Sequence, residues 1–439
     1  MAQSSRMKRR TIGMLAKRLG EARLDSVEDG RDARGKRWAL PALLSGALLG
    51  LIAGARSLKD VEALTEELTP PVRRKLGIAR RMPDTTLRDA LSTLQPNDLR
   101  PALHASVRAA RRRKALEPEG LPFGVVALDG KTTAISACDD FFAQRQTAGD
   151  DNAPLCGALR TVTATLVSTR ARPVIDVTSI AASTNEMGHF GTALGALMAT
   201  YGRSDLFRLI SYDPGESLKR GDAGACSKDN AEAVRQHGLH YFFGLKASQP
   251  TLHREAEQWL GSRQSDQADA TTTDVHSDKS VVRRLYIGDA TAAPEGWEHL
   301  RTVLRVELET LDAVGERVET ENRYFVSSLP RPRLSAAQWL LLVRRHWGVE
   351  TSHQVLDVAF KEDDHPWIEQ NPRAAVVVMV LRRIAYTLLA LWRGVTLRSD
   401  EQRHRSWRDV MRGIEIAVFT ATEEQLARLR RPRLAPAPA

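Results

Sequence analysis

Two aspartates stand directly after apolar segments that favour β-strands. Asp129 follows FGVVAL and precedes Gly130, and Asp213 ends the segment LFRLISYD (206–213). The carboxyl ends of parallel strands meet at one edge of a sheet, which is where ligand sites form in α/β proteins. We therefore predict both carboxylates at the same edge. For either residue taken alone, an ordinary turn at the end of a strand is the plainer explanation.

A third carboxylate, Glu350, lies in a helix predicted over 344–364. An apolar stripe runs along this helix and consists of Val349, Leu356 and Phe360. At about 100° per residue, a polar line lies beside the stripe and consists of Glu350, His353, Asp357 and Lys361. A polar line beside a core stripe could face a cleft. Alternatively, it could be a solvent-exposed side of the helix that is stabilised by charges spaced along it. Lys361 could meet a phosphate there or could simply be solvated.

Three carboxylates brought together by a fold would suit a hard divalent cation. Two Mg²⁺ or Mn²⁺ ions need several carboxylate oxygens and leave open positions for phosphate and water, as phosphoryl transfer requires. A softer metal is not favoured, because the three cysteines form no CxxC pattern; they are Cys138, Cys156 and Cys226. The same cysteine usage indicates neither a disulfide framework nor a zinc site.

Composition and charge narrow the class of protein. Of the 439 residues, 42% are hydrophobic and 27% are charged, which is ordinary globular usage and excludes collagen-like and wholly disordered chains. The net charge of +10 is the balance expected of a protein that meets polyanions. The three unpatterned cysteines favour a reducing cytoplasm. We also expect no export signal, because the basic start of the chain lacks the apolar core of a signal peptide.

Residues 1–118 are predicted to be helical. The uncharged segment 38–55 has glycines at a four-residue spacing, which is seen in membrane helices, but its length and small residues favour a buried helix of a bundle. The amphipathic segment 85–94 could be a DNA-recognition helix or a plain bundle helix. The basic run VRAARRRK (107–114) could contact DNA or form a solvated helix face.

The pattern changes to alternating strands and helices after residue 120. Strands are predicted at 123–130, 161–169, 172–181, 206–213 and 240–246, and helices at 229–238 and 251–260. Ser183 and Glu186 have the spacing of a capping box that opens a further helix, so Glu186 is interpreted as a cap. A polar linker at 262–279 and strands near 281–288, 301–310 and 319–328 form a β-rich insertion, after which the chain returns to helix from Ala336 to Trp392.

Several segments resemble the H-repeat-associated branch of DDE transposases. They are LDGKT (128–132), DAGACSKDNAEAV (222–234), HYFFGLKASQPTL (240–252), ENRYFVSSL (321–329) and HWGVETSHQVLDVAFKEDD (346–364). The resemblance implies an RNase H-like α/β domain, a mixed sheet with helices on both faces. That domain would span 119–395 with the β insertion at about 262–330, preceded by an all-α accessory or DNA-binding domain at 1–118 and followed by a basic C-terminal helix and tail at 396–439.

The resemblance also implies the catalytic and metal-binding residues. The first family Asp falls on Asp129, the second on Asp213 and the Glu on Glu350. The second assignment has an alternative, because PGESLKRGD (214–222) intervenes and Asp222 is the residue followed by the expected AGACS. Asp213 is favoured for its strand context.

This helix differs from that of many related insertion-sequence transposases. Those proteins have Arg four residues before the Glu and Lys seven after it, where this chain has His346 and Asp357.

The function expected from this resemblance is a DNA transposase that cleaves insertion-sequence ends and transfers strands by in-line phosphoryl transfer with two Mg²⁺ or Mn²⁺ ions. Its partner would be double-stranded DNA, both transposon ends and target, bound by a homodimer at synapsis, in the bacterial cytoplasm at the nucleoid and not in a membrane. The insertion 214–222 motivates an alternative, a catalytically inactive transposase-derived DNA-binding protein. A nuclease without strand transfer is a third interpretation.

Overall fold

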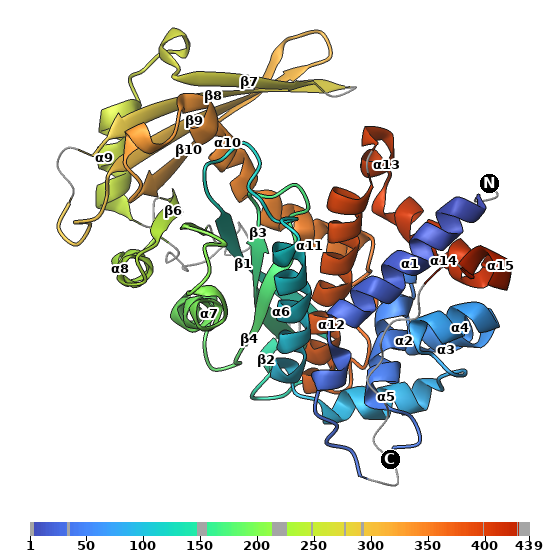
Figure 1. Cartoon of the computed structure of the whole chain (residues 1–439). Coiled ribbons are helices and arrows are strands. Elements are labelled where there is room, and N and C mark those ends of the chain that lie inside the picture. The colour runs from blue at the N-terminus through green and yellow to red at the C-terminus, as the bar shows by residue number, and fades with distance from the viewer. Residues whose placement is uncertain are drawn as a thin grey trace.

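The computed structural model describes residues 4–32, 36–146, 156–212, 226–246, 249–275, 278–290, 294–397, 399–427 and 429. Asp213, Asp222 and the rest of the segment 214–222 therefore lie outside the described residues. Figure 1 shows a helical bundle on one side of the molecule and a sheet that reaches away from it on the other.

The N-terminal part of the chain is helical, as predicted. Its elements are α1 (Ser5–Glu21), the short 3₁₀ helix η1 (Leu24–Ser26), α2 (Leu40–Ala53), α3 (Leu58–Glu67), α4 (Pro70–Leu76), α5 (Asp84–Thr93) and α6 (Pro96–Arg112). Side-chain caps define several boundaries; Ser57, for example, accepts a hydrogen bond from the backbone N–H of Asp60 and closes a capping box at the start of α3.

The apolar segment near residue 45 is a buried bundle helix, as the sequence predicted. Almost all of α2 is buried, and Gly54 ends it in the left-handed conformation, with φ +93°. A methyl group at Gly46 would lie 2.4 Å from the sulfur of Met82, and one at Gly50 would lie 2.6 Å from a methyl carbon of Val61. The glycine spacing therefore serves close packing against neighbouring side chains.

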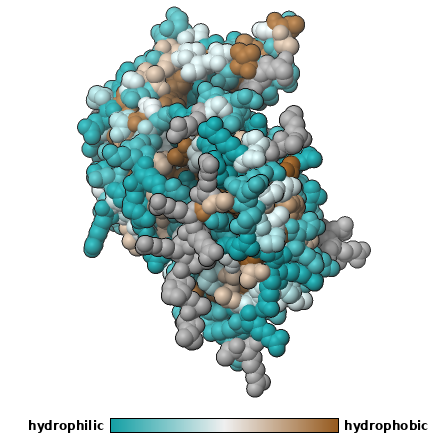
Figure 2. Space-filling view, turned by 45° about the vertical axis from the view of Figure 1, so that its right-hand side comes forward, coloured by the Kyte–Doolittle hydropathy of each residue, from teal (hydrophilic) through white to brown (hydrophobic). Residues whose placement is uncertain are grey.

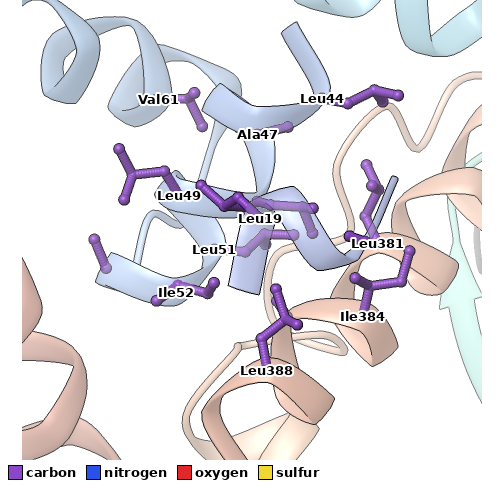
Figure 3. Close-up of a cluster of buried hydrophobic side chains, with 14 of the residues drawn as sticks. Leu19, Leu44, Ala47, Leu49, Leu51, Ile52, Val61, Leu381, Ile384 and Leu388 are labelled. Carbon is purple, nitrogen blue, oxygen red and sulfur yellow. The ribbon is translucent and has the colours of Figure 1, made fainter. Parts of the chain in front are cut away.

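The C-terminal helices complete the same bundle. They are α12 (Pro372–Leu391), a π-helical turn η5 (Trp392–Thr396), α13 (Asp400–His404), α14 (Trp407–Thr420) and α15 (Glu423–Leu426). Figure 3 shows Leu381, Ile384 and Leu388 of α12 beside leucines of α1 and α2. Since α14 and α15 also contact α1, helices from both ends of the chain share one hydrophobic core.

One described helical segment, Pro372–Thr396, is long and apolar enough to cross a membrane, and the bent pair α2–α3 passes the same test together. The apolar window of Pro372–Thr396 is entirely buried inside the protein. Arg382 and Arg383, in the middle of this segment, are also buried: Arg383 pairs with Glu362, and Arg382 donates to the carbonyl of His365 at 2.5 Å. The face in Figure 2 is mostly hydrophilic with scattered hydrophobic residues.

A ten-stranded mixed sheet forms the other half of the molecule. Its strands are β1 (Val125–Ile135), β2 (Ala143–Gln146), β3 (Cys156–Leu166), β4 (Val174–Ile180), β5 (Leu209–Tyr212), β6 (His240–Leu245), β7 (Ala270–Val275), β8 (Lys279–Asp289), β9 (Thr302–Asp312) and β10 (Arg317–Ser327). The order is β2-β3-β1-β5-β6-β10-β9-β8-β7, with β4 also paired to β3. β1 is antiparallel to β3 and parallel to β5, and β5 is parallel to β6.

The four strands β7–β10 extend this sheet, because β10 pairs with β6. The prediction of a linker over 262–279 was wrong for β7. This strand carries three consecutive threonines whose exposure alternates along the strand. Threonine is polar but β-branched, so it favours strands even where its polarity imitates a loop.

Helices cover both faces of the sheet. They are α7 (Glu186–Tyr201), α8 (Lys228–Gln236) and α9 (Pro250–Leu260) on one face and α10 (Ala336–His346) and α11 (Gly348–Val358) on the other; short 3₁₀ helices η3 (Ser265–Gln267) and η4 (Arg331–Arg333) lie in loops. Side chains of β1 alternate between the faces: Leu128 joins the cluster under α7 and Ala127 the cluster under α10. The alternation places Asp129 on the α11 face and Gly130 on the α7 face.

A buried ionic cluster joins the bundle to the sheet. Asp176 of β4 is 3% exposed, and it pairs with Arg100 at 2.7 Å and His104 at 2.9 Å, both from α6. Burial acts to raise the pKa of Asp176, but the hydrogen bonds and charges of His104 and Arg100 outweigh it and lower the pKa. The carboxylate is therefore ionised where α6 packs on β4.

Candidate active site

Asp129 is a buried carboxylate in the middle of the sheet. It is 6% exposed, it pairs with Thr163 of β3 in the backbone ladder, and its side chain meets α11. A charge placed so deeply requires a polar partner, because desolvation disfavours an isolated carboxylate. The prediction that the strand ends at residue 130 and holds Asp129 at its carboxyl end is wrong, because β1 continues six residues past Asp129 to Ile135. The alternative of an ordinary turn at Asp129 is excluded for the same reason.

The partner of Asp129 is His353 of α11. Its Nδ1 lies 3.1 Å from Oδ2 of Asp129. Burial, followed by the positive charges of Arg383 and Lys131, lowers the pKa of His353 to about 3, so the ring is neutral. Since a carboxylate only accepts, Nδ1 carries the proton and donates it, and Nε2 is the acceptor of the ring. No hydrogen-bond partner of Nε2 occurs among the described residues.

A second polar contact joins β1 to α11 one helical turn further along. Lys131 lies on the same face of β1 as Asp129, and its Nζ is 2.7 Å from Oδ1 of Asp357 and 2.9 Å from Oδ2 of Asp363. Thr133 donates a hydrogen bond of 2.9 Å to Asp363. The ordered pairs Asp129–His353 and Lys131–Asp357 show that α11 runs in the direction of β1 and fix its register.

The two carboxylates around Lys131 respond differently to their surroundings. Burial raises the pKa of Asp357. Burial acts in the same direction on Asp363, but hydrogen bonds from Lys131 and Thr133 outweigh it, so the pKa of Asp363 is lowered. Asp363 therefore holds the negative charge of the pair more firmly.

Glu350 lies one turn before His353 in α11, and it is exposed. Residues three apart on a helix are neighbours, with about 5–6 Å between their Cβ atoms. His353 is the residue of α11 that contacts Asp129, so Glu350 precedes this contact by one helical turn. The two predicted site residues therefore lie on two elements, β1 and α11, that are in contact.

The predicted helix 344–364 is two helices. α10 ends at His346, Trp347 adopts φ −71° and ψ 1°, and α11 begins at Gly348. Lys361 follows the end of α11, has a left-handed backbone with φ +55°, and pairs with Asp364 at 2.6 Å. The prediction that Lys361 shares a helix face with Glu350 is therefore wrong.

The second predicted aspartate follows β5. The parallel register pairs Leu128 of β1 with Tyr212, the last residue of β5, and Asp213 is the next residue in the sequence. Asp213 and Asp222 both lie outside the described residues. At the described end of β5, Ser211 contacts the Nδ1 of His346, which links β5 to the end of α10.

A fourth carboxylate, Glu186, adjoins the same strands from the α7 face. Tyr212 donates a hydrogen bond of 3.0 Å to its Oε1, and a methyl group at Gly130 would lie 1.9 Å from its Oε2. Asn185 caps α7 by accepting from the N–H of Gly188 at 2.9 Å, so the capping box predicted from Ser183 is wrong. Sequence patterns gave no sign that Glu186 would contact β1.

The donors of this region suit a hard cation in their chemistry. Carboxylate oxygens are the ligands that Mg²⁺ and Mn²⁺ prefer, and the nearby imidazole is engaged through Nδ1 with Asp129. Within the described ranges, no group of three or more His, Cys, Asp or Glu side chains is arranged to hold a metal ion. Asp129 and Glu350 have the donor chemistry for such an ion, and the third predicted carboxylate, Asp213, lies outside those ranges.

Comparison with known families agrees with this architecture. Residues 22–106 match the family described as DDE_Tnp_1-associated, and residues 146–388 match the transposase DDE domain, which is more than half of the chain. No curated protein matches the chain. Transposases act on DNA, and those with a DDE domain generally use divalent metal ions. The chain belongs to the DDE transposase family.

Proposed function

We propose that this transposase cleaves the ends of an insertion sequence and joins them to target DNA by in-line phosphoryl transfer, with Asp129, Asp213 and Glu350 as ligands of two Mg²⁺ or Mn²⁺ ions. One observation carries the proposal. The contacts of His353 with Asp129 and of Lys131 with Asp357 hold α11 to β1 on consecutive helical turns. Tyr212, the last residue of β5, pairs with Leu128 of β1, next to Asp129 in the sequence. This attachment supports the proposal that a carboxylate from β1 and one from α11 share the metal ions.

Rigid placement is the main contribution of these residues. Metal-binding and catalytic groups must be held within about 0.5 Å of the productive geometry, and supporting hydrogen bonds supply that precision. His353 donates to Oδ2 of Asp129 and orients this carboxylate, while Lys131 holds the following turn of α11. When bound, the ions would lower the pKa of an attacking water and stabilise the departing oxygen.

We assign the catalytic domain to the RNase H-like folds. The order β4-β3-β1-β5-β6, in which β1, β3 and β4 are antiparallel and β1, β5 and β6 are parallel, supports this assignment. Strands β7–β10 would then be the insertion near 262–330. We also assign the chain to the H-repeat-associated branch, on the motifs around Asp129 and Glu350. The domain limits 1–118, 119–395 and 396–439 remain part of this proposal.

Double-stranded DNA with the transposon ends would be bound by a homodimer, because two ends must be cut and joined together. We place the protein in the bacterial cytoplasm at the nucleoid, where its substrate is. The net charge of +10 supports association with this polyanion.

The test is strand cleavage and joining on terminal-repeat duplexes with Mg²⁺. Asp129→Asn, Asp213→Asn and Glu350→Gln should each abolish both reactions and keep DNA binding, because an amide preserves shape while removing the charge. Asp266→Asn is a matched control on an exposed residue outside this region and should leave activity unchanged.

Three outcomes would change the account. Activity in Asp213→Asn together with loss in Asp222→Asn would move the second ligand to Asp222. Cleavage without joined products would indicate a nuclease. DNA binding without cleavage under any divalent ion would indicate the catalytically inactive protein, which the match to the DDE domain does not favour.

A further inference from the structure

Positive charge is concentrated where the end of α6 lies beside α1. The exposed cations of this surface, called here the α1–α6 basic surface, are Lys17, Arg108, Arg111, Arg112, Arg113 and Lys114. The two helices are in contact, and Arg113 bonds to Glu21 at the end of α1. The cations therefore come from two elements and form one surface.

Little negative charge offsets this surface. Glu21 is bound by Arg113 and also by Arg18 at 3.1 Å. Within the part of the chain that the structure describes, four of the cations form no ion pair; they are Arg108, Arg111, Arg112 and Lys114. Burial is the main cause that lowers the pKa of Lys17, and the nearby positive charges of Arg113 and Arg18 lower it further.

A second basic cluster, on α4, shows the opposite arrangement. Arg74 pairs with Glu423, Arg73 donates to the carbonyls of Leu68 and Glu66 at 2.9 and 2.7 Å, and Lys75 donates to the carbonyl of Leu429. Its cations are used within the protein. The cations of the α1–α6 basic surface are available to an external anion.

We propose that the α1–α6 basic surface binds the phosphate backbone of the DNA on which this transposase acts. The inference rests on the proposed function for the identity of the partner. Arginine predominates on the surface, and its planar guanidinium matches phosphate oxygens through paired hydrogen bonds. Arg108 and Arg112 lie one helical turn apart, so the surface presents a row of cations and not a single point charge. Contacts of this kind position the protein without reading sequence.

The test is the salt dependence of DNA binding by the full chain, measured by fluorescence anisotropy with a short labelled duplex of random sequence. The variant Arg111→Gln/Arg112→Gln should lower the magnitude of the slope of log K against log salt by about 1.8, at about 0.9 per phosphate contact in duplex DNA. Arg254→Gln/Lys279→Gln removes the same charge from exposed positions on α9 and β8 and should leave the slope unchanged.

A second variant, Arg108→Gln/Lys114→Gln, should lower the slope by a similar amount, and thermal unfolding verifies that each variant folds. A wild-type slope in both surface variants, or an equal loss in the control, would overturn the inference. Wild-type protein that binds no DNA at any salt concentration would instead contradict the proposed function. Metal-dependent cleavage by the surface variants at low salt distinguishes failure of the surface inference from failure of the proposed function. The surface variants keep the proposed metal-binding carboxylates, so they should still cleave DNA there.

Discussion

Replacing Lys131 by Met tests the contact that holds α11 to β1. The Lys131 side chain is 7% exposed, whereas those of its partners Asp357 and Asp363 are 34% and 46% exposed. Removing one partner of a fully buried ion pair costs about 3–5 kcal/mol, and exposed pairs contribute about 0–1 kcal/mol. Because water reaches both carboxylates, we expect an intermediate loss of about 2 kcal/mol in the free energy of unfolding at pH 7.

The loss should depend on pH. The lowered pKa of Asp363 means that its stabilising contribution is present above its ordinary pKa and is lost as the pH falls through its folded-state pKa. The raised pKa of Asp357 has the opposite effect on stability. Burial disfavours its ionised form, so Asp357 lowers the free energy of unfolding as the pH rises. Without Lys131 both carboxylates can protonate in acid, so the variant should lose less relative to wild type near pH 4.

Urea unfolding followed by circular dichroism at the two pH values measures both effects. The double variant Lys131→Met/Asp357→Asn should recover part of the loss, since one of the unpaired charges is gone. Lys279→Met, on an exposed lysine of β8, is the matched control and should change stability by less than about 0.5 kcal/mol. A Lys131→Met loss as small as that of the control would show that the contact does not hold α11 to β1, and a loss that is equal at both pH values would show that ionisation of the two carboxylates does not set its size.

Three further predictions concern neighbouring contacts. His353→Phe removes the donor to Asp129 and should raise the Mn²⁺ concentration needed for DNA cleavage by about 10–100-fold; an unchanged Mn²⁺ titration would contradict this role. Gly130→Ala should destabilise the protein by about 1 kcal/mol in thermal unfolding, because the added methyl group displaces the carboxylate end of Glu186 from its hydrogen bond with Tyr212. Glu186→Ala should reduce this cost; additive losses would argue against the contact. Asp176→Ala should cost about 3 kcal/mol at pH 7 by breaking a buried cluster, and because the pKa of Asp176 is lowered, the unfolding curves of variant and wild type should converge as the pH falls.

The parts of the fold that could be predicted were those with local signals. Runs rich in β-branched residues marked β1, β3 and β4, apolar and aromatic runs marked β5 and β6, and the small-residue run near Gly46 marked α2. These signals consist of hydrophobic periodicity and composition, which depend on neighbouring residues alone and indicate strands and helices directly. The position of Asp129 directly after the apolar run that begins β1 could be predicted for the same reason.

The contacts that position the site could not be predicted from such patterns. Lys131 and Asp357 are far apart in the sequence, and neither the strand nor the helix signal indicates that they meet. The sequence around Trp347 continues the helix pattern and contains no proline. The break between α10 and α11 at this residue therefore had no sequence signal. Glu186 was assigned to a cap because Ser183 has the right spacing, whereas the adjacent Asn185 caps the helix and frees Glu186 to contact Tyr212.

The central claim is that Asp129, Asp213 and Glu350 hold divalent ions at one place. Its most direct test replaces Mg²⁺ by Fe²⁺ in the DNA-bound protein and uses hydroxyl radicals formed at the metal to cut the nearby backbone, with the cut sites located by mass spectrometry. We expect three groups of cuts, around residues 129, 213 and 350, which excess Mg²⁺ suppresses and Asp129→Asn abolishes. Cuts confined to other segments, or cuts at these segments that Mg²⁺ does not suppress, would contradict it.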